Sequence, residues 1–333
     1  MSGRLSTLFN VETYQAYLRD LHGLTMPRNW SYPPSFILFL LPLAILPYAM
    51  SYSVWVIAGL TVFAGASLKS IRQAAANLRR HALLLALAPA SLINAFFGQN
   101  GFITGVLLYL GVRLASSRPV LSGICIGLLT IKPQLGLLIP FMLILTRNWT
   151  AIASATVTAM ALFLLSGLFF GWQAWIDYVE LAVPFQRYVM EEWSGLFLKM
   201  MPSAYAVGRQ FGLDPTLCLL LQAPMTILAI GLTIWLYAKP RHNREATELL
   251  FLLCVFMATP YSFNYDMTAL MPALLIYWSS KTHTGDLNWQ HVALVGGLYL
   301  LPAIIFIAPI GPVAMLAACW VLVRGVSSGP ARI

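Results

Sequence analysis

The stretch Ile93–Leu135 contains two short apolar runs, each bordered by a polar cluster. Gln99 and Asn100 precede the first run, and Lys132 and Gln134 close the second. Each run spans about 20 Å as a helix, which is shorter than the roughly 30 Å hydrocarbon core of a bilayer. A lysine at membrane depth costs roughly 2.5–3.5 kcal/mol and is therefore normally enclosed by protein or a wet cavity. We expect both clusters to face the same side of a membrane and to form one site.

The composition indicates a membrane protein with an all-α fold and several transmembrane helices. Hydrophobic residues make up 59% of the 333 residues and charged residues 9%, whereas soluble domains carry about 25% charged residues. The net charge of +9 would suggest nucleic acid as a partner of a soluble protein. In a membrane protein, lysines and arginines gather in the cytoplasmic loops, so we expect no nucleic-acid partner. The four cysteines show no CxxC spacing and no histidines pair at metal-ligand spacing, so we expect neither metal nor cofactor.

The apolar segments predict three regions along the chain. Residues 1–35 are expected to form a polar extracytoplasmic segment, and residues 36–325 one multi-span domain of about 11 membrane segments, some short or broken. A long extracytoplasmic loop is predicted at about 171–212, and a cytoplasmic tail at 326–333. With the N-terminus outside, 13 of the 20 lysines and arginines fall on the inside, as the positive-inside rule requires.

This topology assigns the unusual polar motifs to the outer face. Tyr32 precedes two prolines; it either shapes a loop over a site or marks a helix start, since proline suits the first helical turn. Gln99 and Asn100 either bind a polar ligand through their amides or form a surface hairpin. The acidic residues of the predicted loop are interpreted as solvated surface.

Further candidates on the outer face are charged or aromatic. Lys132 is interpreted as functional rather than snorkelling to headgroups, because a proline and Gln134 follow it and indicate a shaped site. Tyr265 and Asp266 begin a membrane segment, where a carboxylate either serves a site or favours the helix N-terminus. Arg209 either meets a phosphate or serves an interface.

Six short motifs also follow one another in an order that has a counterpart in a known family. They are Asn29–Pro34, Leu41-Pro42-Leu43, Leu46-Pro47-Tyr48, Phe97–Asn100, Gly123–Gln134 and Thr259-Pro260-Tyr261. Together they resemble glycosyltransferase family 87, and the resemblance covers about residues 3–325. It implies a polytopic enzyme of the GT-C type in the cytoplasmic (inner) membrane of a bacterium.

The resemblance also implies a reaction and its partners. A hexose such as mannose would be transferred, with inversion and no required metal, from a polyprenyl-phosphate sugar to a hydroxyl of a lipid or glycan acceptor at the outer face. Such a transfer needs a proton acceptor and cations that stabilise the departing phosphate. The candidates for these roles are Lys132 and Arg209 for the phosphate, Gln99, Asn100 and Gln134 for sugar hydroxyls or for positioning, Tyr32 for the acceptor entry, and Tyr261 and Tyr265 as further substrate-binding residues.

Two departures from the family pattern affect the predicted catalytic residue. Where some members carry a His-His pair, this chain has Tyr265 and Asp266. The family's catalytic aspartate follows a first transmembrane helix, and Met1 is expected to lie beyond both, as in an N-terminally truncated member. Glu12 and Asp20 do not match that position, which leaves Asp266 as the substitute base. The alternatives are a transporter or polyprenyl-carrier-binding protein, or a catalytically inactive member.

Overall fold

The computed structural model describes residues 7–23, 29–71, 77–239 and 243–327, and these residues form helices and no strand. The predicted all-α class is therefore confirmed. From residue 328 onward the predicted tail lies outside the described residues, and so do five of the counted charges: Arg4, Arg28, Arg72, Arg241 and Arg332.

Three helices are long and apolar enough to cross a membrane: α4 (Tyr48–Ile71), α10 (Trp149–Phe170) and α15 (Pro215–Tyr237). The pair α5 (Leu78–Ala86) and α6 (Pro89–Phe97) passes the same test as one span bent by 50°. The bend falls at Pro89, since proline disfavours helical geometry at the residue before it. These spans and several shorter apolar helices fit a polytopic helical membrane protein.

The shorter helices complete the bundle. They are α7 (Gly101–Arg113), α8 (Pro119–Leu128), η2 (Leu129–Ile131), η3 (Pro133–Gly136), α9 (Ile139–Leu145), α16 (Arg244–Ala258), η5 (Asn264–Ala269), α17 (Leu270–Thr284), α18 (Trp289–Ile304) and α19 (Gly311–Ser327). Every residue from Ala246 to Ala258 is buried. From Leu249 to Ala258 the helix is apolar on every side, as is typical of a helix inside a protein, and α16 accordingly lies at the centre of the bundle.

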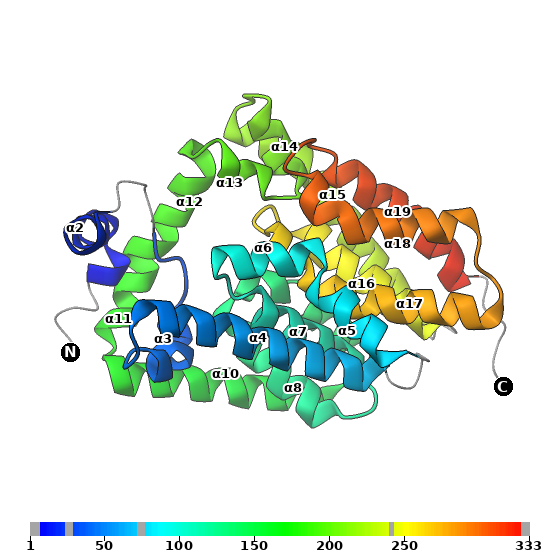
Figure 1. Ribbon diagram of the computed structural model, residues 1–333, viewed down its shortest axis with the longest axis horizontal. Coiled ribbons are helices and arrows are strands. Elements are labelled where there is room, and N and C mark those ends of the chain that lie inside the picture. The colour runs from blue at the N-terminus through cyan, green and yellow to red at the C-terminus, as the bar shows by residue number, and fades with distance from the viewer. Residues whose placement is uncertain (1–6, 24–28, 72–76, 240–242, 328–333) are drawn as a thin grey trace.

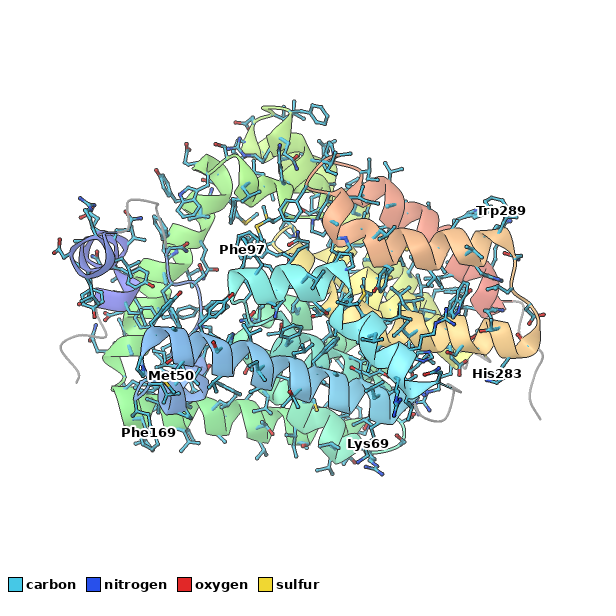
Figure 2. The ribbon with its side chains drawn as sticks, viewed as in Figure 1. Met50, Lys69, Phe97, Phe169, His283 and Trp289 are labelled. Atoms are coloured by element: carbon cyan, nitrogen blue, oxygen red, sulfur yellow. The ribbon has the colours of Figure 1, made fainter. Side chains whose placement is uncertain are left out.

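Most helices run along the long axis of the molecule, as Figure 1 shows. In Figure 2, Lys69 and His283 mark one end of the bundle and Met50 and Phe169 the other. We call the first the basic end, because α4, α7 and α9 all finish there at or beside a cation: Lys69, Arg113 and Arg147. The opposite end, where α6 finishes at Phe97, is called the site end.

Close helix contacts depend on small residues. A Cβ added at Gly123 in α8 would collide with the Ala151 carbonyl and come within 2.6 Å of Ser154 Cβ in α10. Small residues allow the backbones of membrane helices to approach closely. The α8–α10 pair, at the bottom of Figure 1, is packed in this way.

The segment predicted as a long loop is largely helical. It contains α11 (Gln173–Asp177), a π-helical turn η4 (Tyr178–Ala182), α12 (Val183–Glu192), α13 (Leu196–Lys199) and α14 (Ala204–Gln210). The N-terminal part of the chain contains α2 (Val11–His22), α3 (Pro34–Leu40) and η1 (Leu41–Leu43). Ala174 and Ala182 pack with Phe9 in a small core. Tertiary packing supports α11 and α12, because neither carries an apolar run from which sequence alone would predict a helix.

Candidate functional site

A pocket of about 260 Å³ lies at the site end, where most of the predicted outer-face motifs converge. Its walls carry aromatic rings and side-chain amides, and we call it the aromatic–amide pocket. Six of the predicted residues line it directly, and two more lie in the same cluster of loops without lining it. The lining residues from the prediction are Tyr32, Gln99, Lys132, Gln134, Tyr261 and Tyr265, while Asn100 and Asp266 lie behind the wall.

Lys132 reaches the pocket because the helix is broken beside it. The ring of Pro133 pushes the preceding residue out of helical geometry, and Lys132 has φ −140° and ψ 71° between η2 and η3. Its side chain is 3% exposed, and its Nζ lies 2.6 Å from Asp266 Oδ1. The ammonium also lies 4.7 Å from the centre of the Tyr265 ring, which is within cation–π range.

Asp266 is fully buried behind Lys132. One carboxylate oxygen accepts from Lys132, and the other accepts from the Phe263 backbone N–H at 3.0 Å. The second bond closes a cap at the start of η5. Each oxygen thus has one donor within the protein, and the geometry is that of a counter-ion.

Asn100 connects the Lys132 pair to the first polar cluster. Its Oδ1 lies 3.5 Å from Lys132 Nζ, and it precedes α7. The next residue, Gly101, donates its N–H to Asn94 Oδ1 at 2.6 Å. A Cβ at Gly101 would collide with the Tyr265 carbonyl, so this glycine allows the turn to approach the loop that carries Asp266.

Tyr32 and Gln99 form another side of the pocket. The Tyr32 hydroxyl donates to Gln99 Oε1 at 3.3 Å, and Trp55 Nε1 donates to the Gln99 carbonyl at 3.2 Å. Burial, with Asp266 nearby, raises the pKa of the Tyr32 phenol well above its ordinary value. Tyr32 is therefore a neutral donor at physiological pH.

The remaining wall is aromatic. The rings of Phe263 and Tyr265 stack at 5.1 Å with an interplanar angle of 6°, and Tyr261 meets Phe263 edge-on at 5.2 Å. Burial raises the pKa of Tyr261 to about 12, so its phenol is also neutral. Gln134 follows Pro133 in η3 and lines the pocket.

Several residues that line the pocket were not predicted as site residues, although two of them belong to the Asn29–Pro34 motif. Asn29 and Ser31 come from the segment before α3, and Tyr178, Gln186 and Trp193 from the segment predicted as a loop. Gln186 Nε2 donates to the Ser31 carbonyl at 2.7 Å, which joins the two segments. The π-helical turn at Tyr178 is a feature that recurs at functional sites, but it is visible only in the structure.

Other predicted residues lie apart from the pocket. The Arg209 guanidinium donates to the carbonyls of Glu191 and Leu213 and does not line the pocket. It joins the end of α12 to the turn after α14. Glu12 and Asp20 are exposed on α2.

The charge of the lining is simple. Among the described residues that line the pocket, Lys132 is the one charged side chain, and none is an Asp or Glu. The arrangement offers amide and phenol groups for hydroxyls, aromatic faces for apolar surface, and one ammonium for an anion.

Comparison with protein families gives one match. The model for Glycosyltransferase family 87 matches residues 30–260, more than two thirds of the chain. No curated protein and no solved structure matches the chain. The matched range includes Tyr32, Gln99 and Lys132, and it ends just before Tyr261 and Asp266. This match confirms the resemblance seen in the sequence motifs, over a shorter range. The chain therefore belongs to glycosyltransferase family 87 and is a membrane glycosyltransferase.

Proposed function

We propose that the protein transfers a hexose, mannose in the first instance, from a polyprenyl-phosphate sugar to a hydroxyl of a lipid or glycan acceptor, with inversion. The reaction takes place in the aromatic–amide pocket, at the outer face of the bacterial cytoplasmic membrane. The observation that carries the proposal is the convergence on this pocket of polar motifs far apart in sequence, with a buried lysine at its wall.

The lining suits a single sugar unit. A hexose presents hydroxyls at its edge and C–H groups on its faces. Gln99, Gln134 and Gln186 supply amides that both donate and accept, while Tyr261 and Tyr265 supply aromatic surface. Drug-sized ligands fill pockets of roughly 300–1,000 Å³, so the volume of about 260 Å³ accommodates one monosaccharide rather than an oligosaccharide.

Lys132 is assigned to the phosphate of the donor. An ammonium has three N–H donors; two point to Asp266 and Asn100, which leaves one for a ligand in the pocket. In the transfer, the acceptor oxygen bonds to C1 of the sugar while the bond from C1 to the phosphate oxygen breaks. The electron pair of that bond goes to the phosphate, where a nearby cation stabilises the developing charge.

Asp266 acts in this scheme as a positioning residue for Lys132. It is fully buried behind Lys132 and does not line the pocket, so it does not reach an acceptor bound there. The proton goes to a group outside the described lining. A lining whose described residues include no carboxylate to take this proton favours a second candidate function, which is binding of the lipid carrier without transfer.

The test uses the full chain in lipid nanodiscs with polyprenyl-phosphate mannose and a mixture of acceptor lipids. Release of polyprenyl phosphate that depends on acceptor supports transfer. Binding without release supports the carrier-binding function, and neither binding nor release refutes both.

A pair of glutamine variants locates the site. Gln99→Ala removes a lining amide and the acceptor of the Tyr32 bond, and should lower kcat/KM about tenfold or more, equivalent to about 1.4 kcal/mol of lost transition-state binding. Gln290→Ala is the matched control, since Gln290 lies in α18 away from this pocket. Equal rates for the two variants would remove Gln99 from the site.

A further inference from the structure

A second polar cavity lies at the basic end, far from the aromatic–amide pocket. It has a volume of about 770 Å³ and lies where α7, α9 and α15 finish and α8, α10 and α16 begin. Its charged lining consists of three cations and one carboxylate: Arg147, Lys239, Arg244 and Glu248. We call it the basic pocket.

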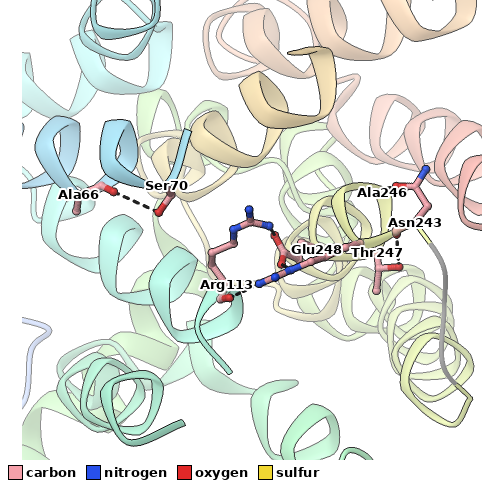
Figure 3. A network of polar contacts seen from close by, with 8 residues as sticks. Ala66, Ser70, Arg113, Asn243, Ala246, Thr247 and Glu248 are labelled. Carbon is pink, nitrogen blue, oxygen red and sulfur yellow. Dashed lines mark hydrogen bonds and ion pairs between the residues drawn. The ribbon is translucent and has the colours of Figure 1, made fainter. Parts of the chain in front are cut away.

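The negative groups of the basic pocket already have partners. Glu248 accepts from Arg113 Nη1 at 2.9 Å, and Figure 3 shows these two residues side by side. It also accepts from Arg244 Nε at 2.6 Å. The Arg113 carbonyl accepts from Arg244 Nη2 at 2.6 Å, and the Ala115 carbonyl accepts from Asn148 Nδ2 at 2.6 Å. The one lining carboxylate and two of the carbonyls at the end of α7 are thus satisfied within the protein.

Two cations of the basic pocket have no such partner. Within the described residues, the side chains of Arg147 and Lys239 make no ion pair and no hydrogen bond, and both are exposed. They lie on different connections of the chain, one after α9 and the other after α15, and both line the cavity. A cavity with unpaired cations on two sides attracts an anion.

The backbone of Arg147 supports a role for its side chain. Arg147 has φ 52°, the one positive φ of a non-glycine residue in the described part of the chain. It occupies the position just past the end of α9, where Asn148 N donates to the Leu143 carbonyl at 2.8 Å. Glycine is usual there because other residues are strained. An arginine is held at this point despite the strain.

We propose that the basic pocket binds a phosphate group. The guanidinium of Arg147 matches two phosphate oxygens and the Lys239 ammonium adds a point charge, while Ser116 supplies a hydroxyl in the lining. The pocket opens among the ends of apolar helices, where lipid headgroups lie, and basic pockets of this kind hold anionic headgroups. An anionic phospholipid and a soluble phosphate compound share this chemistry.

The test compares two probes on the full chain in neutral detergent: dioleoyl phosphatidylglycerol, counted by native mass spectrometry, and inorganic phosphate, followed by its effect on the melting temperature. The variant is Arg147→Gly/Lys239→Gln. Glycine relieves the positive φ at position 147, so this variant should fold at least as stably as the parent. The control is Lys69→Gln/Arg80→Gln, which removes the same charges from exposed sites at the same end.

The proposal expects the pocket variant to bind at least one probe about tenfold more weakly, which is about 1.4 kcal/mol, while the control stays within about twofold of the parent. If the pocket variant loses affinity for phosphatidylglycerol alone, the natural ligand is a lipid headgroup. If inorganic phosphate no longer changes the melting temperature of the pocket variant, the natural ligand is a soluble phosphate compound. If the two double variants bind both probes equally, the basic pocket is not a phosphate site. Transferase activity is not needed for any of these readouts, so the result is independent of the proposed function.

Discussion

The buried pair of Lys132 and Asp266 permits a quantitative prediction. The side chains are 3% and 0% exposed and their charged atoms are 2.6 Å apart, so water does not screen either charge. Removing one partner of a buried pair leaves an uncompensated charge and costs about 3–5 kcal/mol. Lys132→Met and Asp266→Asn should each lower the melting temperature in detergent by roughly 5–10 °C.

The double variant Lys132→Met/Asp266→Asn makes the prediction specific. Both charges are then absent, and the asparagine carbonyl still accepts the Phe263 N–H that Asp266 Oδ2 accepts at 3.0 Å. The double variant should therefore be more stable than either single variant, which is the strong coupling expected of contacting residues. A stable double variant that no longer binds polyprenyl phosphate would separate the phosphate role of Lys132 from its structural role.

The exposed pair Arg187–Glu191, 2.7 Å apart with the arginine 81% exposed, serves as a control. Exposed pairs contribute little to stability, so Arg187→Met should hardly move the melting temperature. The reasoning is refuted if the losses from Lys132→Met and Asp266→Asn simply add in the double variant. It is equally refuted if the single variants melt like the parent.

Three other predictions follow from the structure. Gly101→Ala should lower the free energy of unfolding by about 1–3 kcal/mol through overpacking, because the added Cβ would meet the Tyr265 carbonyl. The control Gly136→Ala should cost less, because no atom lies within 4 Å of its added Cβ. Equal melting temperatures for the two variants would contradict this prediction. Glu248→Gln breaks a carboxylate bridge between two arginines and should cost about 1–3 kcal/mol, measured by thermal unfolding; an unchanged melting temperature would show that the bridge is not stabilising. Burial raises the pKa of Tyr261 from 10.0 to about 12, so the contribution of its neutral phenol to stability is complete below pH 10 and is lost as the pH rises towards 12. Tyr261→Phe should therefore reduce the fall in the free energy of unfolding between pH 10 and 12. An unchanged alkaline profile in this variant would contradict the raised pKa of Tyr261.

Much of the site could be predicted from the order of polar motifs along the chain. Because successive membrane segments alternate in direction, motifs on alternate connections face the same side, and Tyr32, Gln99 and Lys132 do line one pocket. The same reasoning assigned Arg209 to that side but could not say which atoms its guanidinium would contact. Its partners are backbone carbonyls of Glu191 and Leu213, and sequence carries no signal for such contacts.

The sequence by itself determined the all-α membrane class, the family and the clustering of polar motifs at one end of the bundle. The class follows from composition and from the apolar segments, whereas the family and the clustering follow from the identity and order of short motifs along the chain. Only the tertiary structure decided that Asp266 is the counter-ion of Lys132, 134 residues away, and that Gln186 completes the pocket. A contact at that separation is set by how helices pack, and packing depends on side-chain shape across the whole bundle rather than on any local pattern.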